Sequence, residues 1–126
     1  MVSYSGTPLP KKLGINAPSR IKVLRPPENF DLSELGVPAE DEIDVAVAFC
    51  LSHSEMVEVW KHLPSCIRPA GGLWICWPKK ASKVTTDLND SVVRNYGLDF
   101  GWVDNKVCAI NDVFSGLRFV RRLRDR

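Results

Sequence analysis

Three lysines follow directly on an apolar run that contains two tryptophans, and their type and spacing suit ligand chemistry. The run is GLWICWP, residues 72–78. The candidate ligand-binding residues share the short polar segment after it: Lys79, Lys80, Lys83, Thr85, Thr86 and Asp87. Ammonium and hydroxyl groups donate hydrogen bonds to phosphate and carboxylate oxygens. We therefore expect an anion-accepting crevice around Lys79 and Lys80.

Two plainer interpretations of this segment stay open. Lysines in an exposed loop usually do no more than interact with water, and Asp87 can itself cap the start of a helix in place of a bound anion. Lys11 and Lys12 form a second cationic pair. Spacing alone does not decide whether this pair joins the site around Lys79 and Lys80.

Histidines and cysteines give little indication of catalysis or metal binding. His53 and His62 lack the separation of three or four residues that one helix face needs for a shared metal. We expect no metal and no cofactor. His53 is a weak catalytic candidate, because its neighbour Ser52 is explained as a helix cap and no acid is placed to orient the imidazole. The four cysteines show no Cys-x-x-Cys spacing, and three lie in apolar runs typical of buried thiols.

The composition is that of one globular domain over residues 1–126, with 44% hydrophobic and 25% charged residues. A net charge of +2 gives no reason to expect a nucleic-acid or membrane partner. No apolar run approaches bilayer length, and the first residues lack the apolar region of a signal peptide. We expect a cytoplasmic protein. The arginine-rich residues 118–126 favour a solvated or edge-guarding surface over nucleic-acid binding.

Two nearly continuous apolar, β-rich runs predict buried strands at residues 43–51 and 73–77. Between them, Ser52 and Glu55 form a capping box that begins a helix. The helix has an apolar stripe at helical spacing: Met56, Val59, Trp60, Leu63 and Ile67. Residues 69–72 are expected to end this unit as a loop. A strand, a helix and a strand in this order predict a right-handed parallel crossover.

Shorter signals predict the remaining elements. Thr7, Pro8 and Gly14 are expected to cap, begin and close one helical turn. A helix is expected to start at residues 85–87 and to stop at Gly97. The other expected elements are a strand at 20–25, a brief helix at 30–35, and an antiparallel strand pair at 102–111 and 116–123.

Side-chain alternation predicts which faces of the sheet are covered. Trp74 and Trp77 must point to opposite faces, so both faces need a covering layer. In the last strand one face is apolar and the other is basic, with the apolar set Leu117, Phe119 and Leu123 and the basic set Arg118, Arg122 and Arg124. These observations predict an α/β fold, namely a small Rossmann-like three-layer α/β/α domain with a mixed five-stranded sheet.

Four segments together resemble a bacterial family of small proteins that form a domain of unknown function. They are TPLPKKLGI (7–15), GLWICWPKKAS (72–82) followed by TDL (86–88), KVCAIND (106–112) and FSGLRFVRRL (114–123). They are distributed from residue 7 to residue 123, over most of the length of the chain. No activity is carried over from this resemblance.

The order of elements is also similar, more distantly, to the second half of class I S-adenosylmethionine-dependent methyltransferases. That resemblance implies a strand order of 1-2-3-5-4 with an antiparallel terminal pair. It also exposes departures, since the first loop, RPPENF (25–30), has no glycine and the ribose-binding strand-helix unit is missing. We therefore expect a shortened relative that is not catalytic.

Three function classes follow. The leading one is a domain that binds an anionic metabolite or nucleotide at the crevice around Lys79 and Lys80. The second is a structural or regulatory interaction protein, such as a homodimer formed through the end strand. The third is an enzyme of methyltransferase-like fold, with His53 as its first candidate.

Overall fold

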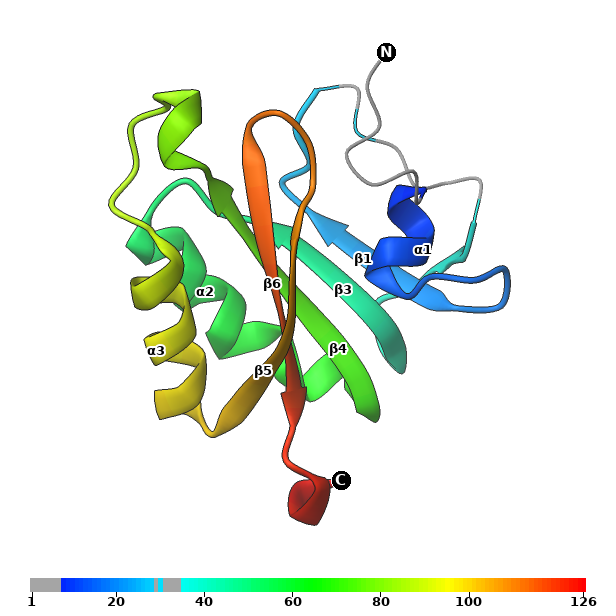
Figure 1. Ribbon diagram of the computed structural model, residues 1–126. Coiled ribbons are helices and arrows are strands. Elements are labelled where there is room, and N and C mark those ends of the chain that lie inside the picture. Colours follow the sequence, from blue (N-terminus) through cyan, green and yellow to red (C-terminus); the bar gives the residue numbers. More distant parts are fainter. Residues whose placement is uncertain (1–7, 29, 31–34) are drawn as a thin grey trace.

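A six-stranded mixed sheet organises the chain (Figure 1). The computed structural model describes residues 8–28, 30 and 35–126. The strands are β1 (Arg20–Leu24), β2 (Val37–Pro38), β3 (Ile43–Phe49), β4 (Ile67–Pro78), β5 (Trp102–Ala109) and β6 (Phe114–Arg121), in the order β2-β1-β3-β4-β6-β5. Pairing is parallel from β2 to β4, and β6 is antiparallel to both β4 and β5. The mixed α/β fold is as predicted.

Helix α2 (His53–His62) connects β3 to β4 and forms because its first turn is capped as predicted. The hydroxyl of Ser52 accepts a hydrogen bond from the backbone N–H of Glu55 at 3.2 Å. The carboxylate of Glu55 accepts one from the backbone N–H of Leu51 at 2.7 Å. Two N–H groups near the helix start are thereby satisfied, which stabilises the parallel β3-α2-β4 crossover.

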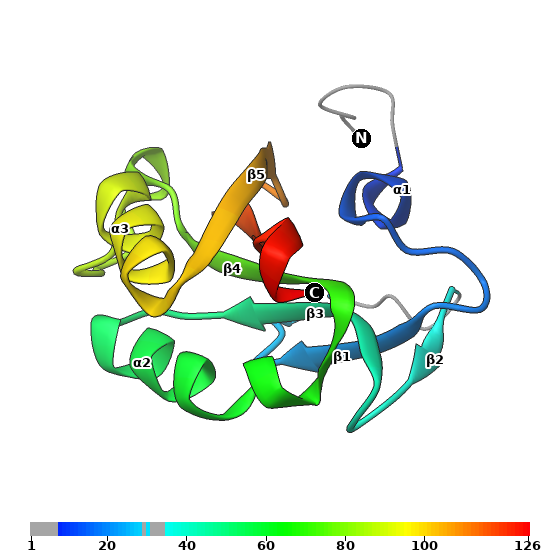
Figure 2. The same cartoon turned by 90° about the horizontal axis from the view of Figure 1, so that it is seen from below.

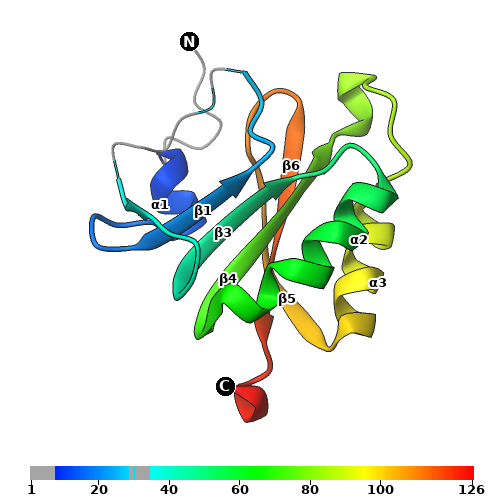
Figure 3. The same cartoon turned by 180° about the vertical axis from the view of Figure 1, so that it is seen from behind.

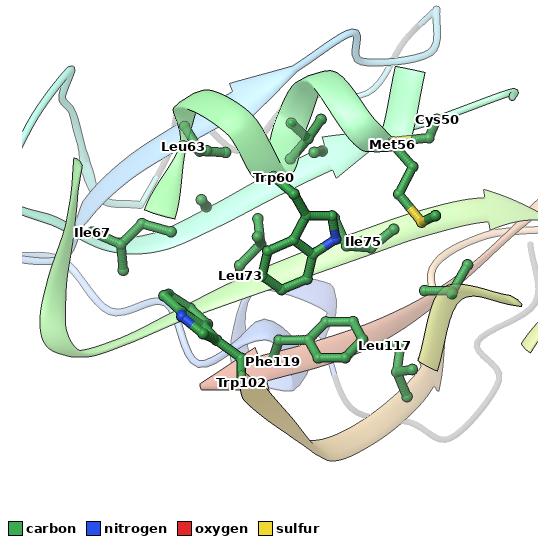
Figure 4. Close-up of a cluster of buried hydrophobic side chains, with 14 of the residues drawn as sticks. Cys50, Met56, Trp60, Leu63, Ile67, Leu73, Ile75, Trp102, Leu117 and Phe119 are labelled. Atoms are coloured by element: carbon green, nitrogen blue, oxygen red, sulfur yellow. The ribbon is translucent and has the colours of Figure 1, made fainter. Parts of the chain in front are cut away.

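The larger core lies under α2 and α3 (Asp90–Phe100), which lie side by side on one face of the sheet (Figures 1 and 3). Trp60 of α2 is at its centre, with its ring centroid 5.1 Å from that of Phe119 and 5.7 Å from that of Trp102 (Figure 4). Leu73 and Ile75 of β4 form part of the sheet surface beneath these rings and are fully buried. Burial of each such side chain stabilises the fold by about 1.5–3 kcal/mol.

A second core covers the opposite face, where α1 (Leu9–Leu13) lies across the sheet from α2 (Figure 2). Leu13 and Ile15 pack there against residues of β3 and against Trp74 of β4. The indole N–H of Trp74 donates to the carbonyl of Leu13 at 3.2 Å. Trp77 belongs to the other core, so the prediction that Trp74 and Trp77 point to opposite faces is confirmed.

The prediction of five strands is wrong, because β2 adds a sixth at the edge beside β1. The other strands follow the order expected from the methyltransferase resemblance. Strand β2 is only two residues long, and its ladder bonds run from the N–H of Val37 to the carbonyl of Ser19 (2.7 Å) and from the N–H of Ala39 to that of Ile21 (2.8 Å). Pro38 between them has no N–H, which an edge strand tolerates.

Strand β4 begins well before the expected residue 73. The predicted loop at residues 69–72 is part of it, and the register shifts there: Ile67 pairs with Ile43, and the next paired residue of β4, Gly72, pairs with Val45. Gly71 fits there because a Cβ at its position would lie 2.8 Å from the carbonyl oxygen of Ile43. Gly71, which was expected to belong to a loop, therefore allows a close approach of the β4 backbone to that of β3.

Both predicted ends of α3 are wrong. The helix begins at Asp90, with Asn89 as its N-cap, rather than at residues 85–87. It continues past Gly97 to Phe100, and Gly101 in the left-handed region ends it. Gly97 is required by packing, since a Cβ there would lie 2.1 Å from an edge carbon of the Phe119 ring.

The first helix and the C-terminal residues also differ in part from prediction. Pro8 is the N-cap of α1 rather than its first residue, while Gly14 closes the helix as expected with φ 81°. Thr7 and most of the expected helix at 30–35 lie outside the described residues. Leu117 and Phe119 share the larger core, but Leu123 lies beyond β6 and is 80% exposed. Within the described ranges, every helix is too short or too polar to cross a bilayer.

Candidate functional site

The predicted lysines lie on a turn at the carboxyl end of β4, directly after Pro78. The turn is a short 3-10 helix, Lys80–Ser82, and is held at its start by two hydrogen bonds. The N–H of Lys79 donates to the carbonyl of Val113 at 2.7 Å, and the hydroxyl of Ser82 donates to the carbonyl of Lys79 at 2.6 Å. Lys83 ends the turn in the left-handed region, with φ 61°. Lys80 and Lys83 are exposed and Lys79 is half-buried. The turn therefore presents ammonium groups beside the carboxyl ends of the parallel strands.

Thr86 and Asp87 are engaged with the loop after β3 rather than with the lysine turn. The carboxylate of Asp87 accepts a hydrogen bond from the backbone N–H of His53 at 2.8 Å. The hydroxyl of Thr86 donates to the carbonyl of Leu51 at 2.7 Å and accepts from the N–H of Leu88 at 3.1 Å. These side chains therefore fasten the segment before α3 to the start of α2. Thr85 is exposed.

The start of each long helix is capped by the protein's own side chains. At α2 the caps are Ser52 and Asp87, and at α3 the side chain of Asn89 accepts from the N–H of Val92 at 2.9 Å. Helix N-termini attract anions through unpaired N–H groups and the helix dipole. Since side-chain oxygens already accept hydrogen bonds from these backbone N–H groups, an anion at the carboxyl ends of the strands would be held mainly by the lysines.

His53, the catalytic candidate, lies at the first turn of α2 with an exposed side chain. Its ring meets that of Tyr96 edge to face, with centroids 5.7 Å apart. The neighbouring Ser52 hydroxyl caps the helix, as predicted. Among the described residues, no carboxylate forms an ion pair with the His53 ring, so no acid in that part of the chain orients it as a catalytic triad would require.

Arg25 also lies at the carboxyl ends of the parallel strands, and the sequence analysis did not identify it as a candidate site residue. It follows β1 with φ 52°, in the left-handed region, and its Nε lies 3.9 Å from the carboxylate of Glu55.

Cys50 is fully buried nearby, and burial raises the pKa of its thiol to about 12, although the charge of Arg25 opposes the rise. Such a thiol stays protonated and is a poor nucleophile. Cys50 and Cys76 are buried as predicted, and none of the four cysteines forms a disulfide.

Lys12 lies near the end strand β5, where its carbonyl accepts a hydrogen bond from the Lys106 ammonium at 2.7 Å. It lines a hollow with Lys106 and Arg118, and none of the lysines of the β4 turn lines that hollow. Arg118 was expected on a solvated face, but it is half-buried. Arg118 is paired with Trp74 in the ladder, and its guanidinium lies over Gly72, whose missing side chain is the sequence signal that could have located it.

No family model matches the chain, and no curated protein matches its sequence. A ligand class can therefore be inferred only from the chemistry of the side chains at each site.

Proposed function

We propose that this protein is a small Rossmann-like domain, without catalytic activity, that binds an anionic metabolite or nucleotide at Lys79 and Lys80. The observation that carries the proposal is the gathering of Lys79, Lys80 and Lys83 in one turn directly after the carboxyl end of β4. Open α/β sheets bind ligands outside the carboxyl ends of their strands. A cationic turn at that position suits an anion.

The arrangement of layers supports the Rossmann-like part of the proposal. Helices α2 and α3 cover one face of the sheet and α1 covers the other. The strands apart from β2 have the order of the second half of a methyltransferase sheet. The chain is in this proposal a shortened relative of that fold, related to the small bacterial family that its sequence segments resemble.

The same proposal excludes S-adenosylmethionine as the ligand. The loop after β1 carries Arg25, Pro26 and Pro27 where a cofactor-binding methyltransferase has glycines, whose backbone can approach the cofactor. A side chain or proline ring at those positions blocks that approach. Isothermal titration of the purified protein with S-adenosylmethionine should therefore give no saturable heat at micromolar concentrations.

The experiment that tests the proposal is a thermal-shift screen with inorganic phosphate, nucleotides and S-adenosylmethionine. A ligand that binds only the folded state raises the melting temperature. We expect phosphate-bearing ligands to do so, and to act more weakly at high salt, since exposed charges are screened within about 10 Å at 0.1 M. The double variant Lys79→Ala/Lys80→Ala should lose the response to nucleotides and keep its fold.

The matched control is Lys61→Ala, which removes an exposed lysine from α2 on the same protein. It should respond to nucleotides like the wild type. A double variant that still responds to nucleotides would place the anion elsewhere, and a wild type that responds to no anion would overturn the proposal.

The second candidate function is a homodimeric interaction module. It is favoured by the end strand β5, which lies at a sheet edge and exposes 57% of Val107. Unpaired edge strands can pair with a second chain. Analytical ultracentrifugation tests it: a mass that rises with concentration in the wild type and stays monomeric in Val107→Lys would support this function.

A further inference from the structure

Two adjoining hollows lie at the opposite end of the sheet from Lys79, near the amino ends of β1 and β3. The first has a volume of about 240 Å³ and the second of about 530 Å³, and both are lined by Gly14 and Arg118. Arg118 lies over Gly72 of β4. Along an extended strand, Gly72 and Lys79 are roughly 23 Å apart at about 3.3 Å per residue. The hollows are therefore separate from the lysine turn.

Arg118 is the central cation of this surface. A Cβ on Gly72 would lie 2.5 Å from its Nε, so the glycine makes room for the guanidinium to lie against the backbone of β4. Its Nη1 donates to the side-chain oxygen of Asn105 at 3.3 Å. In the part of the chain that the structure describes, no carboxylate pairs with it. A guanidinium carries several N–H donors, and among the described residues Asn105 is the one hydrogen-bond acceptor that Arg118 meets.

The surroundings of Arg118 are strongly cationic. Burial lowers the pKa of its guanidinium, and the nearby charge of Arg126 lowers the pKa further. The first hollow is also lined by Lys12 and Lys106, and by no aspartate or glutamate among the described residues. A half-buried cation beside like charges is unfavourable until an anion compensates it.

The second hollow differs in character. Its polar lining includes Asn16, Ser19 and the ion pair of Asp44 with Arg68, in which the two side chains lie 3.3 Å apart. The other carboxylate oxygen of Asp44 accepts from the backbone N–H of Arg20 at 2.8 Å. The hydroxyl of Ser19 donates to the side-chain oxygen of Asn16 at 2.9 Å and accepts from the backbone N–H of Asn16 at 3.0 Å. A second anionic group placed here would be repelled by Asp44, whereas uncharged hydroxyl groups would not be, and they can use the remaining lone pairs and N–H groups of these side chains.

We infer that the two hollows together bind a small phosphate monoester, such as a sugar phosphate, with its phosphate at Lys12, Lys106 and Arg118 and its uncharged polar body toward Asn16 and Ser19. Three cations match a phosphate dianion better than a single carboxylate, and a guanidinium can bind phosphate oxygens in pairs. The first hollow is smaller than the roughly 300 Å³ of the smallest usual ligand sites, which suits a phosphate group alone. The second supplies the remaining volume.

Amide NMR titrations of the full chain with glucose phosphate, inorganic phosphate and glucose test this inference. We expect glucose phosphate to shift the amide signals of Gly14, Asn105 and Lys106, inorganic phosphate to bind more weakly, and glucose alone to have no effect. Binding should weaken about tenfold or more in Arg118→Gln and in Lys106→Gln, because each loses a charge-assisted hydrogen bond. Lys106 is exposed, so the second variant keeps the test valid if the first does not fold.

The control is Arg124→Gln, which removes one positive charge from an exposed residue outside the hollows. It should bind glucose phosphate like the wild type, and so should Lys79→Ala/Lys80→Ala. Unchanged affinity in both Arg118→Gln and Lys106→Gln, or no binding by the wild type, would overturn the inference. Signal changes centred on residues 80–82 would also overturn it and would instead support the site on the lysine turn.

Discussion

The carboxylate of Asp87 accepts a 2.8 Å hydrogen bond from the backbone N–H of His53, the first residue of α2. The two residues are 34 positions apart in the chain. Together with the bond from the Thr86 hydroxyl to the Leu51 carbonyl, it ties the segment before α3 to the loop after β3. The acid that the sequence placed beside the lysines thus serves the start of another helix.

Removal of this contact should destabilise the protein. We expect Asp87→Ala to lower the free energy of unfolding by about 1 kcal/mol, the usual effect of losing a helix cap. Asp87→Asn, whose side-chain oxygen can still accept the bond, should lose less. Urea unfolding at neutral pH measures both. Asp99→Ala, at an exposed position of α3, is the control, and equal losses at the two aspartates would contradict a capping role.

Gly97 should not tolerate alanine, although alanine normally favours a helix by about 1 kcal/mol. The added methyl would overlap the buried ring of Phe119, and overpacking of a core typically costs about 1–3 kcal/mol or more. We expect a net loss of at least about 1 kcal/mol in urea unfolding. Ser91→Ala, at an exposed position of the same helix, should be neutral or stabilising. A stabilised Gly97→Ala would show that α3 moves freely away from β6.

Two buried tryptophans should respond differently to phenylalanine. The indole N–H of Trp74 donates to Leu13, whereas that of Trp60 has no acceptor among the described residues. Trp74→Phe leaves a buried carbonyl unpaired, and Trp60→Phe removes an unpaired donor. We therefore expect Trp74→Phe to be more destabilising by about 1 kcal/mol. Thermal and urea unfolding of the two variants make the comparison, and the reverse order would refute it.

Alkaline pH should destabilise the protein partly through Cys50. Its pKa rises from 9.0 to about 12 because of burial. A raised folded-state pKa means that the stabilising contribution is present below pH 9.0 and is lost as the pH rises toward 12. Between pH 8 and about 10.5, Cys50→Ala should lose about 2 kcal/mol less than the wild type, at about 1.4 kcal/mol per pH unit. Equal losses would mean that the thiol ionises freely in the folded protein.

The strand β3 and the start of helix α2, at the centre of the fold, could be predicted from the sequence. The nearly continuous apolar run at 43–51, interrupted by Asp44, has no polar face to leave in water, so it predicts a strand covered on both sides, and β3 is such a strand over Ile43–Phe49. The capping box at Ser52 and Glu55 fixes the start of α2 by contacts within four residues. Local chemistry was sufficient where the partners are close in the chain.

The remaining elements depend on partners that are far apart in the chain. Thr86 and Asp87 look like a helix start, but their hydrogen bonds go to Leu51 and His53, so α3 begins later. Gly97 looks like a helix stop until Phe119 is seen against it. The spacing of residues along the sequence does not reveal contacts between distant segments. For the same reason the sequence did not predict that Arg118 lies over Gly72.

The position of β6 between β4 and β5 has a consequence for biosynthesis. Strand β6 follows both β4 and β5 in the chain but lies between them in the sheet, so β4 and β5 cannot be joined until residues 114–121 have emerged from the ribosome. Until then the edge of β4, with Trp74 and Trp77, lacks its neighbour and can pair with other chains. Folding intermediates of the nascent chain should therefore be prone to aggregate, and translation that stalls before residue 114 should yield insoluble protein.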